Sequence, residues 1–177
     1  MFFIHTIQKR TLYKIHPERD VRFMSMDQAR NICFVFDINE EKIFDVVKRI
    51  TRLLQHKKIN YQGLAINLTK NHFSEQALDC QIQVIAKKDL SRIGTPDPKI
   101  IEKVISENAD LFIDFSSSYS YTHDYIARSS KATFKVGRLN YDNNPYDLVI
   151  GNNGEDASSP MGFLKHLFHY LSSIKSA

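Results

Sequence analysis

The chain has 177 residues, of which 42% are hydrophobic, 25% charged and 11% aromatic, with a formal net charge of +4. This composition excludes a disordered chain, and no apolar run is long enough to span a membrane. The two cysteines, Cys33 and Cys80, are too few for a disulfide framework or a structural zinc site, and we expect both to be reduced and buried.

Basic residues are concentrated near the N-terminus. Residues 1–30 contain six basic and three acidic side chains, whereas residues 31–177 contain 18 basic and 17 acidic ones. A protein that mainly binds nucleic-acid phosphates usually has a broader positive surface, so nucleic acid is a disfavoured partner. The opening sequence MFFIHTIQKR lacks the basic start and the cleavage site of a signal peptide, and we expect a cytoplasmic protein.

Residues 1–29 are predicted to form a basic N-terminal arm followed by a linker. Residues 3–16 favour a short amphipathic helix, which Pro17 ends. The apolar positions of this helix are Ile4, Ile7, Thr11 and Ile15. We expect the basic residues Lys9, Arg10 and Lys14 to bind a protein or an anionic partner, and the arm to contribute little to the core.

The regular part of the chain begins at Arg30. Residues 32–36 are a continuous apolar run, which is typical of a strand buried on both faces. A helix capped by Asn39 should follow, with apolar positions at Ile43, Val47, Ile50 and Leu54. Two more strands are predicted over residues 61–68 and 81–86, and a basic loop over residues 87–94.

The second half of the chain repeats this alternation. Asp97 and Pro98 are a helix N-cap and first helical residue, and residues 111–115 form a fourth strand. The remaining predicted elements are a helix over 120–130, strands over 133–136 and 146–150, and a last helix from about Ser159. Residues 140–145 leave no room for a helix, so one of the last two strands is an edge strand or runs antiparallel.

Alternating strands and helices predict a single α/β domain over residues 30–177. The expected architecture is a three-layer Rossmann-like sandwich with a mainly parallel sheet of five or six strands. The apolar runs at 32–36 and 111–115 should be its central strands.

The motifs of common enzymes with this architecture are missing. No strand is followed by G-x-G-x-x-G, and neither a Walker loop nor a G-x-S-x-G elbow occurs. His166 and His169 are three residues apart on the last helix, but no third ligand is spaced with them. We therefore assign no catalytic residue, cofactor or metal, and we disfavour an enzyme.

A ligand of this fold would bind beyond the carboxyl ends of the strands. The polar residues at those ends include Asp37, Asn67, Lys87, Lys88, Ser116, Ser117, Ser118, Arg138, Asn152 and Asn153. We predict that any small ligand is anionic and is bound by Ser116, Ser117, Ser118, Lys88 and Arg138, with help from helix N-terminal amides. The alternative is that one serine caps the next helix and the others are solvated.

Other polar residues near the serines have structural interpretations. Asp114 lies inside a strand, where a carboxylate usually accepts backbone N–H groups or pairs with a base. Asp37 and Asp114 could otherwise be a catalytic carboxylate pair. For Tyr119, Tyr121 and Tyr125 we expect packing with the phenolic ends in water rather than a pocket.

Residues 110–138 carry a resemblance. The run Asp110-Leu-Phe-Ile-Asp-Phe, then Tyr125-Ile-Ala-Arg-Ser-Ser-Lys-Ala and Phe134-Lys-Val-Gly-Arg, resembles a short uncharacterised bacterial family with no assigned activity. Lys88-Asp89-Leu90 and the Gly94-Thr95-Pro96 turn fit the same family. Residues 110–138 are also similar to the N-terminal Rossmann-like domain of heptosyltransferase-type glycosyltransferases, whose second, nucleotide-sugar-binding domain this chain is too short to contain.

Two functional classes remain open. In the first, which we favour, the protein is a non-catalytic binding or adaptor domain that uses its basic arm. In the second, it binds or acts on a phosphorylated metabolite or sugar at the carboxyl edge of the sheet.

Overall fold

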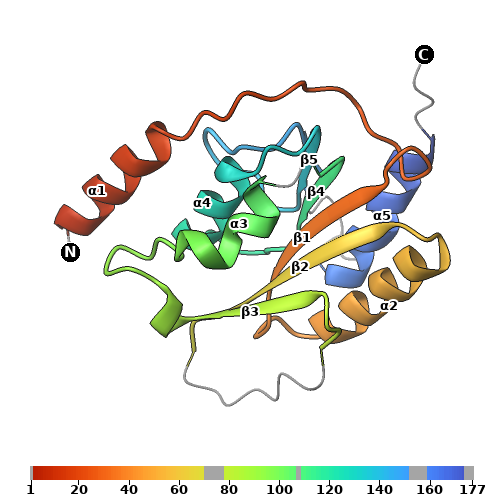
Figure 1. The fold of residues 1–177 in the computed structure, drawn as a ribbon, viewed down its shortest axis with the longest axis horizontal. Coiled ribbons are helices and arrows are strands. Elements are labelled where there is room, and N and C mark those ends of the chain that lie inside the picture. The colour runs from red at the N-terminus through yellow and green to blue at the C-terminus, as the bar shows by residue number, and fades with distance from the viewer. Residues whose placement is uncertain (1, 70–77, 107–108, 152–158, 174–177) are drawn as a thin grey trace.

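The computed structural model describes residues 2–69, 78–106, 109–151 and 159–173. Its centre is a six-stranded sheet in which all neighbouring strands are parallel (Figure 1). In spatial order the strands are β3 (Ile82–Ala86), β2 (Asn60–Asn67), β1 (Asn31–Asp37), β4 (Leu111–Asp114), β5 (Phe134–Gly137) and β6 (Leu148–Val149). The predicted parallel α/β fold is confirmed, with β1 and β4 at its centre and β6 as a parallel edge strand.

Helices cover both faces of the sheet. They are α1 (Phe2–Tyr13), α2 (Ile43–His56), α3 (Pro98–Ser106), α4 (Tyr121–Ser129) and α5 (Pro160–Ser173), with a short 3-10 turn, η2 (Lys87–Asp89). Helices α2 and α5 cover one face, and α3 and α4 cover the other (Figure 1). On β1, Phe34 and Phe36 belong to the core with α2 and α5, whereas Cys33 and Val35 belong to the core with α3 and α4. Successive strand residues face opposite sides, so the continuous apolar run stabilises both layers. Cys33 is buried as predicted, but Cys80, in the turn before β3, is exposed.

The two acidic or amide N-caps predicted for the first half of the domain, Asp97 and Asn39, have different outcomes. Asp97 accepts the N–H of Lys99 at 2.9 Å and begins α3 as expected. The prediction for Asn39 is wrong, because α2 is preceded by Lys42 in a left-handed conformation with φ 61°. The physical reason is Asp37. Its Oδ1 accepts hydrogen bonds from the backbone N–H of Asn39 at 2.8 Å and from the side-chain Nδ2 of Asn39 at 2.9 Å, so Asn39 belongs to a separate turn before the helix.

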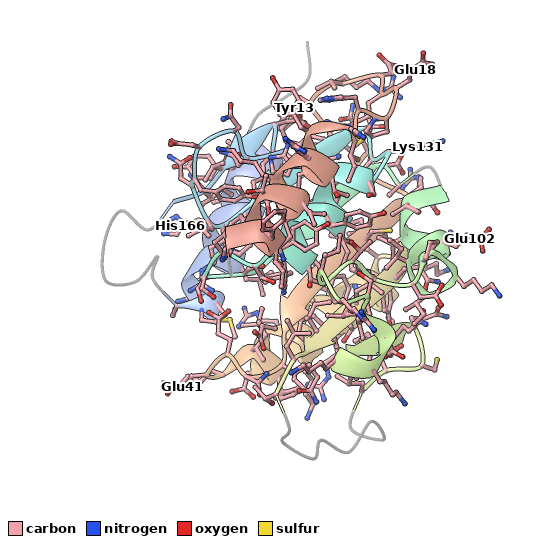
Figure 2. All side chains as sticks on the ribbon, turned by 90° about the vertical axis from the view of Figure 1, so that its left-hand side faces the viewer. Tyr13, Glu18, Glu41, Glu102, Lys131 and His166 are labelled. Carbon is pink, nitrogen blue, oxygen red and sulfur yellow. The ribbon has the colours of Figure 1, made fainter. Side chains whose placement is uncertain are left out.

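The N-terminal helix lies across α4 (Figures 1 and 2). Gln8 Nε2 donates to the carbonyl oxygen of Ile93 at 2.7 Å, and Leu12 is buried. Two positions of the predicted apolar stripe, Ile4 and Ile7, are each 44% exposed. The helix therefore touches the body through Gln8 and Leu12 and leaves most of its apolar side chains in solvent.

The segment between α1 and β1 crosses the domain from the α4 side to the α5 side (Figure 1). Met24, Met26 and Ala29 are buried members of the core that α2 and α5 cover, so the expectation that residues 1–28 contribute little to the core is wrong. Residues 26–28 form a turn, in which the N–H groups of Gln28 and Ala29 donate to the carbonyl oxygen of Ser25 at 3.2 and 3.1 Å. An ion pair holds the start of this segment against the domain: Nη2 of Arg19 lies 2.5 Å from Oδ2 of Asp147.

Candidate functional site

The strand order reverses between β1 and β4, and this point carries the predicted serines. Open α/β sheets bind ligands beyond the carboxyl ends of the strands at such a point. A hollow of about 200 Å³ lies there, between the turn that follows β1 and the turn that follows β4. Its lining residues are Asp37, Asn39, Glu40, Ser116, Ser117, Ser118, Ser120 and His123.

The serines do not cap α4. Ser120 occupies the N-cap position, but its side chain makes no capping hydrogen bond, so the capping interpretation is wrong. Ser117 and Ser118 are exposed. Within the ranges that the structure describes, the hydroxyls of these three serines make no hydrogen bond. They are therefore available to a ligand beside the first amides of α4.

Asp114 is the centre of a buried hydrogen-bond network below the hollow. Its Oδ1 accepts the backbone N–H of Ser116 at 2.8 Å and also the Ser116 hydroxyl. Its Oδ2 accepts the hydroxyl of Tyr146 at 2.7 Å. The predicted structural interpretation of Asp114 is confirmed, because the carboxylate accepts a backbone N–H and lies 3.4 Å from Nδ1 of His123.

The network favours the charged form of this carboxylate. Burial works against that form, but His123 and the hydrogen bonds from Ser116 and Tyr146 outweigh it and hold the pKa of Asp114 below its ordinary value. The same surroundings act oppositely on Tyr146, where burial and the Asp114 charge raise the pKa well above its usual range. A fixed negative charge therefore lies under the hollow.

The Ser116, His123 and Asp114 side chains do not form a hydrolase triad. Ser116 Oγ lies 2.6 Å from Nδ1 of His123, the same ring nitrogen that faces Asp114. A triad needs the serine and the carboxylate on opposite ring nitrogens, so that the imidazole can remove the serine proton. Ser116 instead donates its proton to Asp114 and is a structural hydroxyl.

Arg138 and Lys88, the other two residues predicted to bind an anion, lie in different places. Arg138 is buried, with Nη1 donating to the carbonyl oxygen of Phe115 at 3.1 Å and to the Glu40 carboxylate at the edge of the hollow. Lys88 is exposed and lines a different hollow, between η2 and α3. The fold thus gathers Ser116, Ser117, Ser118 and Arg138 around one point and places Lys88 elsewhere, while anion binding stays a prediction.

Tyrosines surround a smaller hollow that adjoins the first. Tyr119 and Tyr141 make an edge contact with ring centroids 5.2 Å apart, and Tyr146 lines the same space. Tyr119 is 54% exposed, but it lines this hollow and its hydroxyl donates to Oδ2 of Asp124 at 3.4 Å, so the expected phenolic end in water is not found there. Tyr121 is buried, with its hydroxyl 3.0 Å from Thr95 Oγ1. Sequence patterns did not identify Tyr141 and Tyr146 as neighbours of the serines, because they come from the distant β5–β6 connection.

The remaining sequence predictions concern metals, membranes and the arm. Within residues 2–69, 78–106, 109–151 and 159–173, no three His, Cys, Asp or Glu residues lie together as a metal site would require. None of the helices in these ranges is both long and apolar enough to cross a bilayer. Lys9, Arg10 and Lys14 are exposed, they lie on or just after α1, and none of them lines the serine hollow. Asn152 and Asn153 fall outside the described residues.

Comparison with known protein families assigns the chain to one of them. It belongs to a family of unknown function, DUF6913, whose model matches residues 1–174. No curated protein matches the sequence. The family description names no ligand or activity.

Proposed function

We propose that the domain binds a small phosphorylated metabolite with free hydroxyl groups, such as a sugar phosphate, in the hollow between β1 and β4. The observation that carries this proposal is the set of three hydroxyls, on Ser117, Ser118 and Ser120, that line the hollow without a partner among the described residues. Hydroxyl donors next to the N-terminal amides of a helix suit a phosphate group.

The charges around the hollow support a ligand that is anionic at one end only. Glu40 is paired with Arg138, which offsets its charge. Asp37 uses Oδ1 to accept two hydrogen bonds from Asn39, while its Oδ2 accepts none from the described part of the chain. That oxygen suits a ligand hydroxyl and repels a second anionic group.

The residues first predicted for the ligand enter this proposal in different roles. Ser117 and Ser118 are direct contacts, whereas Ser116 and Arg138 hold the walls of the hollow through Asp114 and Glu40. Lys88 would contact only a ligand long enough to leave the hollow. The resemblance of residues 110–138 to the N-terminal domain of heptosyltransferase-type enzymes stays a prediction and is consistent with a sugar-like ligand.

A ligand screen on the full chain tests this proposal. We expect glycerol 3-phosphate, ribose 5-phosphate or glucose 6-phosphate to raise the melting temperature and to give saturable binding by calorimetry. Ser117→Trp should fill the hollow and abolish binding, because residue 117 is exposed at its rim. Ser172→Trp, a matched change at an exposed position of α5, should leave binding intact.

The outcomes separate the possibilities. If none of the three sugar phosphates binds the wild type, or if Ser117→Trp binds as well as the control, the hollow is not the ligand site. Lys88→Ala extends the test, since a loss of affinity in that variant would mean that the ligand reaches the second hollow.

A second proposed function is supported by the surface of α1. Phe3 is 84% exposed and Tyr13 is 79% exposed, and Figure 2 shows Tyr13 at the outer edge of the molecule. Exposed aromatic rings beside Lys9, Arg10 and Lys14 are suited to a docking contact with an anionic partner, the adaptor role that the sequence favoured.

Charge reversal tests the adaptor role. The triple variant Lys9→Glu, Arg10→Glu and Lys14→Glu should lose salt-sensitive binding to heparin, used as a polyanion probe. The triple variant should be retained on heparin less strongly than a control with charge reversal at exposed lysines of another surface, such as Lys87→Glu and Lys88→Glu. Equal retention of both variants would reject the role of the helix.

A further inference from the structure

The proton positions in the buried network follow from counting donors. The Ser116 hydroxyl has one proton, and it donates that proton to Oδ1 of Asp114, which is charged and can only accept. Ser116 Oγ therefore meets Nδ1 of His123, 2.6 Å away, as an acceptor. Nδ1 must carry the proton of the neutral imidazole, because two acceptors cannot share a hydrogen bond.

In the neutral form of the ring, the second nitrogen is a free acceptor. A neutral imidazole has one N–H, so the proton on Nδ1 leaves Nε2 with its lone pair, and the inference concerns this form of His123. Nε2 makes no hydrogen bond with the residues that the structure describes. His123 is 4% exposed and lines both the serine hollow and the smaller hollow beside it, and its unpartnered Nε2 retains some accessible surface.

We propose that His123 is a specificity-determining residue whose Nε2 accepts a hydrogen bond from a ligand hydroxyl, with Ser116 and Asp114 as positioning residues that fix its tautomer. This inference rests on the proposed function and narrows it. Serine hydroxyls and helix amides only donate to the phosphate end, so Nε2 and Asp37 Oδ2 are the acceptors for the hydroxylated end. A ligand with a phosphate but no suitably placed hydroxyl would leave Nε2 unpaired and bind more weakly.

The tautomer can be measured without any ligand. In long-range ¹H–¹⁵N spectra of the wild type at neutral pH, the His123 ring should have a protonated Nδ1 and an unprotonated, acceptor-type Nε2. Ser116→Ala removes the acceptor that holds the Nδ1 proton and should increase the Nε2–H form. A wild-type ring that is predominantly Nε2–H, or protonated on both nitrogens, would overturn the inference while leaving the proposed function standing.

Binding by two variants tests the contact itself. In His123→Asn the side-chain amide can still donate to Ser116 but no atom remains at the Nε2 position, so the network should survive. Affinity for the best-binding sugar phosphate should fall about tenfold, the effect expected for one lost hydrogen bond, whereas affinity for sulfate, which has no hydroxyl, should not change. His123→Gln, whose longer amide reaches further into the hollow, should recover part of the loss.

The failures of the two proposals are distinguishable. A wild type that binds no sugar phosphate overturns the proposed function and this inference together. A wild type that binds, with His123→Asn preserving the ratio of sugar phosphate to sulfate affinity, overturns only the role of His123. An equal loss for both ligands in a well-folded variant also rejects it, because the effect would then be on the hollow as a whole.

Discussion

Stability should rise with pH above neutrality because of one buried lysine. Lys135 is 2% exposed, and its Nζ donates to the carbonyl oxygen of Ala127 at 2.6 Å in the last turn of α4. Burial, with a smaller contribution from the nearby Arg19 charge, lowers the pKa of Lys135 from 10.5 to about 7. The neutral amine can still donate its hydrogen bond, so the fold tolerates the lysine best when it is uncharged.

The sign and size of the effect follow from proton linkage. Between about pH 7 and pH 10.5 the unfolded chain keeps the Lys135 proton and the folded chain does not, so the free energy of unfolding increases with pH. The slope approaches roughly 1.4 kcal/mol per pH unit. Over the whole window the gain is on the order of 5 kcal/mol, and below about pH 7 the contribution is constant.

Urea denaturation across this window is the assay. Measurements should stop at about pH 9.5, because tyrosines ionise at higher pH. The raised pKa values of Tyr61 and Tyr146 then make the free energy of unfolding decrease with pH, which opposes the effect of Lys135. Lys135→Met keeps an unbranched side chain as far as Cε, removes the titratable amine and should flatten the slope. Lys131→Met, at an exposed position marked in Figure 2, is the control and should keep it. If Lys135→Met retains the wild-type slope, the assignment to Lys135 is wrong.

Three further predictions concern the Asp114 network. Asp114→Ala leaves the Ser116 N–H and the Tyr146 hydroxyl without their acceptor and should lower the free energy of unfolding by about 2–5 kcal/mol in urea titrations, well above the effect of an exposed Asp→Ala change. In acid, the stability from Asp114 is present above its ordinary pKa and is lost as the pH falls through its lowered folded pKa, so the difference between wild type and Asp114→Ala should shrink there. Gly137→Ala would overlap the Tyr146 ring and should cost about 1–3 kcal/mol, whereas Gly151→Ala, which meets open space, should be nearly neutral in the same titrations.

Local sequence patterns were sufficient to predict the buried faces of β1 and α2 and the start of α3. The run around Phe34 predicts a doubly buried strand because alternation fixes two faces, and the stripe of Ile43 and Ile50 predicts the buried side of α2 because helical periodicity fixes one. Asp97 is a comparable case, since a cap acts two residues away. Each of these signals is contained within a few residues of sequence.

Two features of the N-terminal segment were not predictable from local patterns. Ile4 and Ile7 have helical spacing, but each is 44% exposed, because α1 touches the body through Gln8 and Leu12 and not through this stripe. Met24 and Met26 lie in a stretch without clear periodicity, yet both are buried members of the core that α2 and α5 cover. Tertiary position, which neither pattern contains, decided both outcomes.

The candidate site was predictable in its place but not in its contacts. Strand ends located Ser117 and Ser118 correctly at one edge of the sheet. The ion pair between Glu40 and Arg138 spans 98 residues, and no local signal indicates that this arginine is already engaged. No sequence motif marks His123, because its hydrogen-bond partner Ser116 lies on the turn before α4 and not on the same helix.

The distribution of buried polar residues argues for function on the β4–α4–β5 half of the sheet. Among the described residues, the buried polar or charged ones other than Thr51 all lie between 114 and 138: Asp114, Ser116, Thr122, His123, Asp124, Ser130, Lys135 and Arg138. Burying charges is costly even when they are paired, and apolar residues of similar volume often stabilise a core better. On the β2–β3 half the same fold is built with an apolar interior, so the architecture itself does not require this polarity. Polar side chains held at such a cost beside the hollow are consistent with positioning groups for a ligand, and this is why Asp114, Ser116 and His123 are the residues to test first.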